Sequence, residues 1–102
     1  MPLPIIPIIW GLVVGIAVTI IVMLYYEQII GWFRVRQALK QSDANNLAFS
    51  IQQRLASGNI KTVQGIFNER TNQLLDAKKY ESQNVDDELA RLHTNDDIVL
   101  YT

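Results

Sequence analysis

The sequence predicts a membrane-anchored α+β protein, in which one N-terminal transmembrane helix precedes a small αββαβ domain with a three-stranded sheet. Residues 1–26 contain no charged side chain, whereas the remainder of the 102-residue chain is ordinary polar sequence. In that remainder, runs rich in β-branched residues alternate with runs that have helical spacing. We therefore expect a transmembrane anchor over 1–30, a juxtamembrane helix or bend over 31–42, and a small cytoplasmic α+β domain over 43–102.

The apolar run at the N-terminus is long enough to cross a bilayer as a helix. About 20 apolar residues, at a rise of about 1.5 Å each, span a hydrocarbon core of about 30 Å. A cleaved signal peptide is one alternative, but no basic residue precedes the run and no small-residue cleavage site follows it. A buried core helix is the other alternative, and the run is too long and too uniformly apolar for that in so short a chain.

Flanking residues predict how the helix sits in the membrane. Cations follow the run and none precedes it, which predicts an N-terminus outside and a C-terminal domain in the cytoplasm. Glu27 is expected either to reach the headgroups or to act within the membrane on a proton or a partner cation. The side chains expected at the membrane interface are Trp10, Tyr25, Tyr26, Trp32, Arg34, Arg36 and Lys40.

Small residues form a stripe within the predicted anchor. Gly11 and Gly15 make a GxxxG pattern, and Thr19 continues it at the next helical position. Such a stripe allows two helix backbones to approach closely, so these three residues are candidates for helix pairing. The pattern also arises by chance in apolar segments, and an incidental or lipid-facing stripe is the alternative.

The second part of the chain predicts a helix followed by a hairpin. Residues 43–57 carry apolar side chains at helical spacing, after a possible N-cap at Ser42–Asp43 and before a C-cap at Gly58. Residues 60–67 and 73–80 read as strands around a turn-rich loop, with a possible bulge at Gly65.

The end of the chain predicts one more helix and one more strand. Residues 85–93 have a helical pattern with carboxylates in the first turn, where they favour the helix dipole, and Asn84 is the expected cap. Residues 98–101 then read as a final strand.

The sequence offers no recognisable catalytic or metal-binding motif. His93 is the single histidine, cysteine is absent, and there is no phosphate-binding loop. None of the serines, Ser50 included, lies in a nucleophile motif, and the acidic residues near His93 lack the spacing of metal ligands. The net charge of −1 gives no attraction to nucleic acid. We therefore expect no enzyme, no cofactor, no metal, no nucleic-acid partner and no small-molecule substrate.

The predicted plan favours an assembly role. A small three-stranded sheet has two open edges, which recruit other strands. We expect a non-enzymatic single-pass membrane protein that serves as a small accessory or structural subunit, with the lipid bilayer and a protein partner or further copies of itself as partners. The alternatives are a structural membrane protein of a virion with an internal lipid bilayer, and a holin-like or membrane-active protein.

Overall fold

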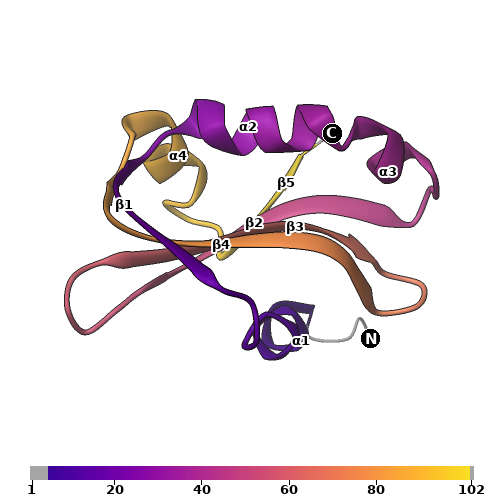
Figure 1. Ribbon diagram of the computed structural model, residues 1–102, viewed down its shortest axis with the longest axis horizontal. Coiled ribbons are helices and arrows are strands. Elements are labelled where there is room, and N and C mark those ends of the chain that lie inside the picture. The colour runs from indigo at the N-terminus through magenta and orange to yellow at the C-terminus, as the bar shows by residue number, and fades with distance from the viewer. Residues whose placement is uncertain (1–4, 102) are drawn as a thin grey trace.

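A five-stranded mixed sheet organises the protein, with helices on both of its faces (Figure 1). The structure is a computed structural model, and it describes residues 5–101. Its elements are α1 (Ile5–Leu12), β1 (Val18–Leu24), α2 (Tyr26–Val35), α3 (Gln37–Gln41), β2 (Asn46–Arg54), β3 (Ile60–Asn68), β4 (Gln73–Val85), α4 (Asp87–Leu92) and β5 (Ile98–Tyr101).

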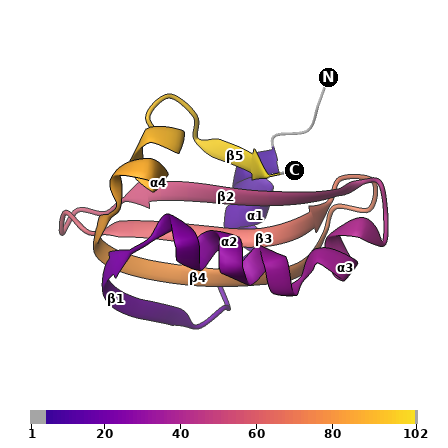
Figure 2. The same cartoon turned by 90° about the horizontal axis from the view of Figure 1, so that it is seen from above.

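The strands follow the order β1-β4-β3-β2-β5 across the sheet, as Figure 2 shows from above. β2, β3 and β4 form an antiparallel meander, and β5 adds antiparallel to β2. β1 is the exception, because it runs parallel to β4 and pairs Val18 with Lys79. The two edges of the sheet are therefore β1 and β5.

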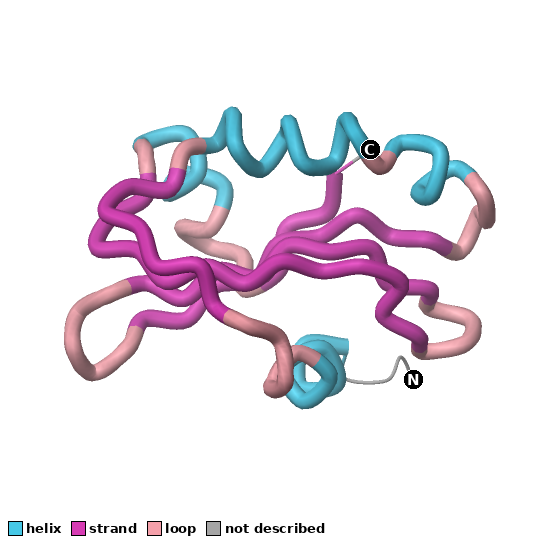
Figure 3. Tube along the Cα trace, in the orientation of Figure 1, coloured by secondary structure: helices cyan, strands magenta, loops and turns pink. Residues whose placement is uncertain are grey.

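Helices cover the two faces unequally (Figure 3). α2, α3 and α4 lie over one face, here called the α2 face, and α1 alone lies over the other, the α1 face. Each face has its own apolar core. On the α1 face the buried members are Ile9, Val13, Phe49, Ile51, Val63 and Phe67. On the α2 face they are Leu24, Ile29, Tyr80 and Leu89.

The predicted transmembrane helix is wrong. Among residues 5–101, no helix is long and apolar enough to cross a membrane. The apolar run divides instead into α1, a turn and β1, which enters the same sheet as the rest of the chain. The single-pass fold class and the location inferred from it, with the N-terminus outside and the domain in the cytoplasm, are corrected accordingly. Residues 1–4 of the expected anchor lie outside the described residues.

Two features explain why the apolar run does not continue as one helix. Val18–Leu24 is rich in β-branched residues, which suit a strand paired in a sheet. The buried Lys79 side chain donates a 2.9 Å hydrogen bond from Nζ to the carbonyl of Val13, at the end of α1. The same carbonyl also accepts a 3.1 Å bond from the amide of Ile16, so Lys79 ties the turn that ends α1 to β4.

The expected helix over 43–57 is also wrong, because β2 occupies most of it. β2 pairs with β3 at every position from Asn46 to Arg54, and with β5 on its other side. Its central residues are buried on both faces, from Ala48 to Ile51. A strand covered on both faces does not need alternating polarity, so apolar residues can fall at helical spacing by chance.

The remaining elements agree with the expectations. The strands over 60–67, 73–80 and 98–101 are present as β3, β4 and β5, and the helix over 85–93 is present as α4. β4 is longer than expected, and the irregularity between β3 and β4 falls at Ile66/Phe67 rather than at Gly65. The cap of α4 is Asp86, not Asn84. The sheet has five strands instead of three because β1 and β2 join it.

Candidate functional site

The outer edge of β1 is the most unusual surface feature of the described residues. No strand among residues 5–101 pairs with that edge, since β1 ends the sheet. The strand reads VTIIVML, without a charge, a proline or a glycine. Ile20 and Val22 are 73% and 65% exposed, which is unusual for β-branched apolar residues within a strand.

The exposed apolar surface extends beyond the strand. Val14, in the turn before β1, is exposed, and so is Val18 at the start of the strand. We call the set Val14, Val18, Ile20 and Val22 the β1 patch. Ile21 packs beside the core of the α2 face, so alternation along the strand places Val18, Ile20 and Val22 on the α1 face. The single helix α1 covers that face only in part (Figure 1). The opposite edge differs, because β5 is only four residues long.

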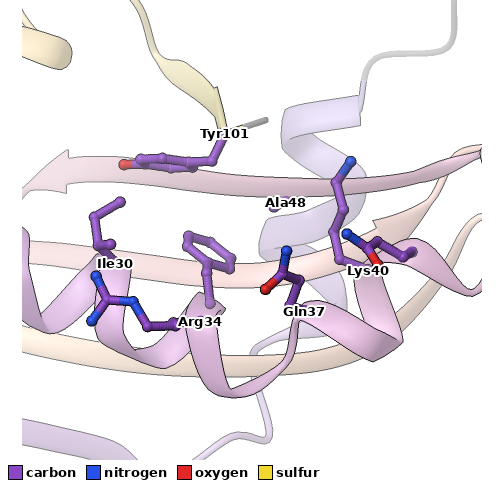
Figure 4. Close-up of a pocket in the computed structure, with 8 residues that line it drawn as sticks. Ile30, Arg34, Gln37, Lys40, Ala48 and Tyr101 are labelled. Atoms are coloured by element: carbon purple, nitrogen blue, oxygen red, sulfur yellow. The ribbon is translucent and has the colours of Figure 1, made fainter.

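A cavity of about 240 Å³ lies between α2, α3 and the β2–β5 side of the sheet (Figure 4). We call it the β5-side cavity. Its apolar lining comes from Ile30, Phe33, Ala48 and Tyr101. The rings of Phe33 and Tyr101 are in contact, with centroids 5.0 Å apart. Ala48, a small residue on β2, leaves the space that the two rings border.

The polar lining of the β5-side cavity is basic. It comes from Arg34, Gln37, Lys40 and Gln41, and none of the carboxylate side chains between residues 5 and 101 lines the cavity. In Figure 4 the charged ends of Arg34 and Lys40 lie on opposite sides, with Gln37 between them. The ion pairs among residues 5–101 use Arg36 and Arg70, so both cavity cations lack an acidic partner within that range.

The hydroxyl of Tyr101 connects the cavity wall to a buried polar chain. Ser50 Oγ lies 2.8 Å from Tyr101 Oη and 2.8 Å from His93 Nε2. Ser50 is completely buried, so no substrate can reach its hydroxyl in this structure. Although a serine beside a histidine is the arrangement of a nucleophile and its base, this pair lacks the access that such chemistry requires.

The predicted helix-pairing residues do not share a helix. Gly11 lies in α1, Gly15 lies in the turn after it, and Thr19 lies in β1. Only the first is helical, so the three do not form the helix face that GxxxG packing requires. The physical reason is that the helix stops at Leu12, before the stripe is complete.

The aromatic residues expected at a membrane interface make contacts within the fold. Trp10 packs beside the core of the α1 face, and the Lys61 amine lies 5.8 Å from its ring centroid. Tyr25 precedes α2 as its cap residue, while Tyr26 packs beside the core of the α2 face. Trp32 stacks against the guanidinium of Arg36 on the next turn.

The expected interfacial cations have two different environments. Arg36 forms a 2.7 Å ion pair with Asp76 of β4, which fixes α2 over the sheet. Arg34 and Lys40 line the β5-side cavity instead. Glu27 lies in the first turn of α2, where a carboxylate favours the helix dipole.

Comparison with known proteins adds no assignment, because no family model, curated protein or solved structure matches this chain. Among residues 5–101, no three side chains that could bind a metal come together. The sequence reasoning missed six cavity residues, which are Ile30, Phe33, Gln37, Gln41, Ala48 and Tyr101. No local motif marks them, since the cavity exists only where α2 and α3 lie against β2 and β5.

Proposed function

We propose that this protein is a non-enzymatic assembly subunit that pairs with a second copy of itself through the outer edge of β1. One observation carries the proposal. An uncharged strand of β-branched residues lies at an open sheet edge, with Ile20 and Val22 largely exposed. Exposed apolar surface of this kind is typical of interaction sites.

The edge of β1 carries unpaired backbone groups that recruit another strand. Monomeric proteins protect such edges with lysine, proline, bulges or very short strands. β5 has the last of these protections, because it is four residues long. β1 has none of them over its seven residues. An unprotected edge that persists in a folded protein is best explained by a strand that covers it in the assembled state.

A second copy is the partner that suits this strand. In a two-fold antiparallel pairing centred on Ile20, Ile20 lies opposite the same residue of the second copy, and Val18 lies opposite Val22 of the second copy. The exposed apolar side chains of both β1 patches then form one ladder on one face of the joined sheet. Because β1 carries no charge, the pairing brings no like charges together.

Such a contact closes on itself. An isologous interface about a two-fold axis produces a dimer and leaves no further β1 edge to extend a chain. The two five-stranded sheets would join into one continuous sheet. A discrete dimer fits an accessory subunit better than a lattice does. The accessory-subunit, virion and membrane-active roles expected from the sequence all assumed a membrane-spanning helix, which residues 5–101 do not contain.

Sedimentation of surface variants tests the proposal. We expect the natural chain to sediment as a dimer and Ile20→Lys and Val22→Lys to sediment as monomers, because lysine at either position replaces an apolar cross-strand contact and is a residue that protects sheet edges from pairing. Val35→Lys is the matched control, since this valine of α2 is 81% exposed and lies outside β1. A natural chain that is monomeric at all concentrations overturns the proposal, and so does a dimer that survives both β1 substitutions.

Disulfide crosslinking through introduced cysteines tests the register of the pairing. Any disulfide must then involve an introduced residue, because the chain has no cysteine of its own. Paired Cα atoms in antiparallel strands lie about 4.5–5.5 Å apart, which is within the range of a disulfide. Ile20→Cys should therefore form a disulfide-linked dimer. Val18→Cys alone should not, whereas Val18→Cys combined with Val22→Cys should. A crosslink through Val35→Cys at equal yield would show that the Ile20→Cys product arises from random collision.

A further inference from the structure

The β5-side cavity has the composition of a ligand site, with an apolar base and a basic rim. Its base is made of side chains that present carbon surface to the cavity, since the Tyr101 hydroxyl is already hydrogen-bonded to Ser50. Small-molecule sites are commonly lined this way, with a few polar groups that fix the orientation of an apolar ligand body.

The arrangement along the helices concentrates these side chains on one stripe. Ile30, Arg34, Gln37 and Gln41 recur at spacings of four, three and four residues through α2 and α3. Within each helix this spacing keeps the side chains on one side, Ile30 and Arg34 in α2 and Gln37 and Gln41 in α3. The stripe faces β2 and β5, where Ala48 and Tyr101 complete the cavity.

Charge distinguishes this cavity from an ordinary packing defect. Arg34 and Lys40 border it, and within residues 5–101 no acidic side chain lines it. Elsewhere on the same helical segment, Arg36 is neutralised by Asp76 at 2.7 Å. Two cations that have no acidic partner in the described part of the chain, placed beside an apolar space, favour a ligand that supplies negative charge and apolar surface together.

We propose that the β5-side cavity binds a small organic carboxylate with an apolar or aromatic body. The body lies against Phe33 and Tyr101, and the carboxylate accepts hydrogen bonds from Arg34 or Lys40. The carboxamides of Gln37 and Gln41 add neutral donors at the same rim. The proposal departs from the expectation, drawn from the sequence alone, that the protein has no small-molecule ligand.

The size of the cavity restricts the ligand class. At about 240 Å³ it lies below the range of roughly 300–1,000 Å³ that is usual for drug-sized ligands. A nucleotide or a long acyl chain would therefore extend well beyond the cavity. Inorganic phosphate would fit, but it would leave the apolar base unused. A carboxylate with one ring or a short aliphatic chain uses both parts of the cavity.

Calorimetric titration of the full chain tests the proposal with defined probes. The probes are benzoate, phenylacetate and hexanoate, with benzamide and inorganic phosphate as comparisons. We expect at least one carboxylate to bind in a saturable manner, and benzamide to bind at least about tenfold more weakly than benzoate because it lacks the charge. The absence of saturable binding by all three carboxylates overturns the proposal. Equal binding of benzamide and benzoate, or phosphate binding as tight as any carboxylate, overturns it too.

Substitutions locate the binding. Either Arg34→Gln or Lys40→Gln should raise the dissociation constant of the best carboxylate about tenfold, because it removes the charge-assisted contact that holds the carboxylate. Arg91→Gln is the matched control, since this exposed arginine of α4 does not line the cavity. Carboxylate affinity that is unchanged in both cavity variants, or lowered equally by the control, overturns the assignment to this cavity.

A spectroscopic readout separates binding in the cavity from binding elsewhere. Titration followed by NMR should shift the side-chain amide signals of Gln37 and Gln41 while those of Gln73 and Gln83 on β4 stay unchanged. Uniform shifts at all four residues contradict the proposal. The outcome is independent of dimer formation, since the cavity lies at the β5 side of the sheet and the proposed dimer contact lies at β1 (Figure 2).

Discussion

Ser50 of β2 and His93, the residue that follows α4, are joined by a 2.8 Å hydrogen bond between Oγ and Nε2. The other ring nitrogen, Nδ1, lies 3.2 Å from the backbone carbonyl of Asp96, which can only accept. Nδ1 of the neutral ring therefore carries the proton, and Nε2 accepts from Ser50. Ser50 in turn accepts from Tyr101, so the bonds run in one direction from Tyr101 to His93.

The direction of these hydrogen bonds requires a neutral His93 ring, which predicts that acid destabilises the protein. Burial lowers the pKa of His93 below its usual 6.5, although the Asp96 carbonyl and the nearby Asp96 and Asp97 charges oppose the effect. As the pH falls below about 6.5, His93 takes up a proton in the unfolded chain before it does so in the folded protein. The contribution of neutral His93 to the free energy of unfolding should therefore be fully present above about pH 6.5 and decrease as the pH falls. Urea denaturation between about pH 7.5 and pH 5.5 measures the effect.

The matched variant for this prediction is His93→Gln. Because His93 is the only histidine, the slope of stability with pH in that window should largely disappear in the variant. The pKa of Asp43 is lowered from 3.8, chiefly by the backbone hydrogen bond from Asn45, so its contribution is lost only in more acidic solution. A slope that persists in His93→Gln would contradict the assignment.

The hydrogen bond between Tyr80 and Gln64 should make the free energy of unfolding fall as the pH rises in alkaline solution. Tyr80 Oη donates a 2.6 Å bond to Gln64 Oε1, and Gln64 Nε2 donates to the carbonyl of Ile29, which ties α2 to the sheet. Burial raises the pKa of Tyr80 to about 12. The tyrosine ionises near pH 10 in the unfolded chain. The contribution of Tyr80 to the free energy of unfolding should therefore be fully present below pH 10 and be lost as the pH rises towards 12.

Substitution tests the same contact at neutral pH. Tyr80→Phe leaves the buried Gln64 oxygen without a partner and should cost about 1–3 kcal/mol in the free energy of unfolding. Tyr25→Phe is the control, because Tyr25 is exposed and its change should cost less than about 0.5 kcal/mol. Chemical denaturation of both variants measures the difference, and equal effects would count against the role of the buried contact.

Asp86 joins the starts of two helices. Its carboxylate accepts a 3.1 Å bond from the amide of Leu89, which caps α4, and a 3.0 Å bond from the amide of Tyr26, the first residue of α2. Asp86→Ala removes both bonds and should cost about 1–3 kcal/mol. Asp87→Ala, one residue further on in the first turn of α4, should cost less than about 1 kcal/mol. Thermal unfolding that ranks the two variants in the reverse order would contradict this account.

Replacement of two different glycines by alanine should change the free energy of unfolding in opposite directions. A methyl group on Gly65 of β3 would lie 2.7 Å from the carbonyl oxygen of Asp76, so the paired strands would have to move apart. Gly65→Ala should therefore cost roughly 1–3 kcal/mol. Gly31 lies inside α2 with open space at the same position, and Gly31→Ala should add about 0.5–1 kcal/mol because alanine favours helix. Denaturation midpoints of the two variants check both signs.

Local patterns were sufficient for the C-terminal half of the chain. The strands β3, β4 and β5 and the helix α4 lie where the sequence places them, because turn residues, alternation and helix-capping carboxylates are local signals. β2 was missed, because burial on both faces removes the alternation that identifies a strand. The cavity cations Arg34 and Lys40 were noticed as charges, but their role was assigned to a membrane.

The amino-acid sequence alone decides that residues 5–24 are apolar and uncharged, but it does not decide what buries them. A span in lipid and a strand at a sheet edge both satisfy that composition. The choice depends on β4. Lys79 of this strand pairs with Val18, and the Lys79 side chain donates a hydrogen bond to the carbonyl of Val13. The Ser50–His93 bond and the β5-side cavity likewise join residues that are far apart in the chain. Such contacts form only when the strands assemble, because no local preference encodes a pairing partner so distant in the sequence.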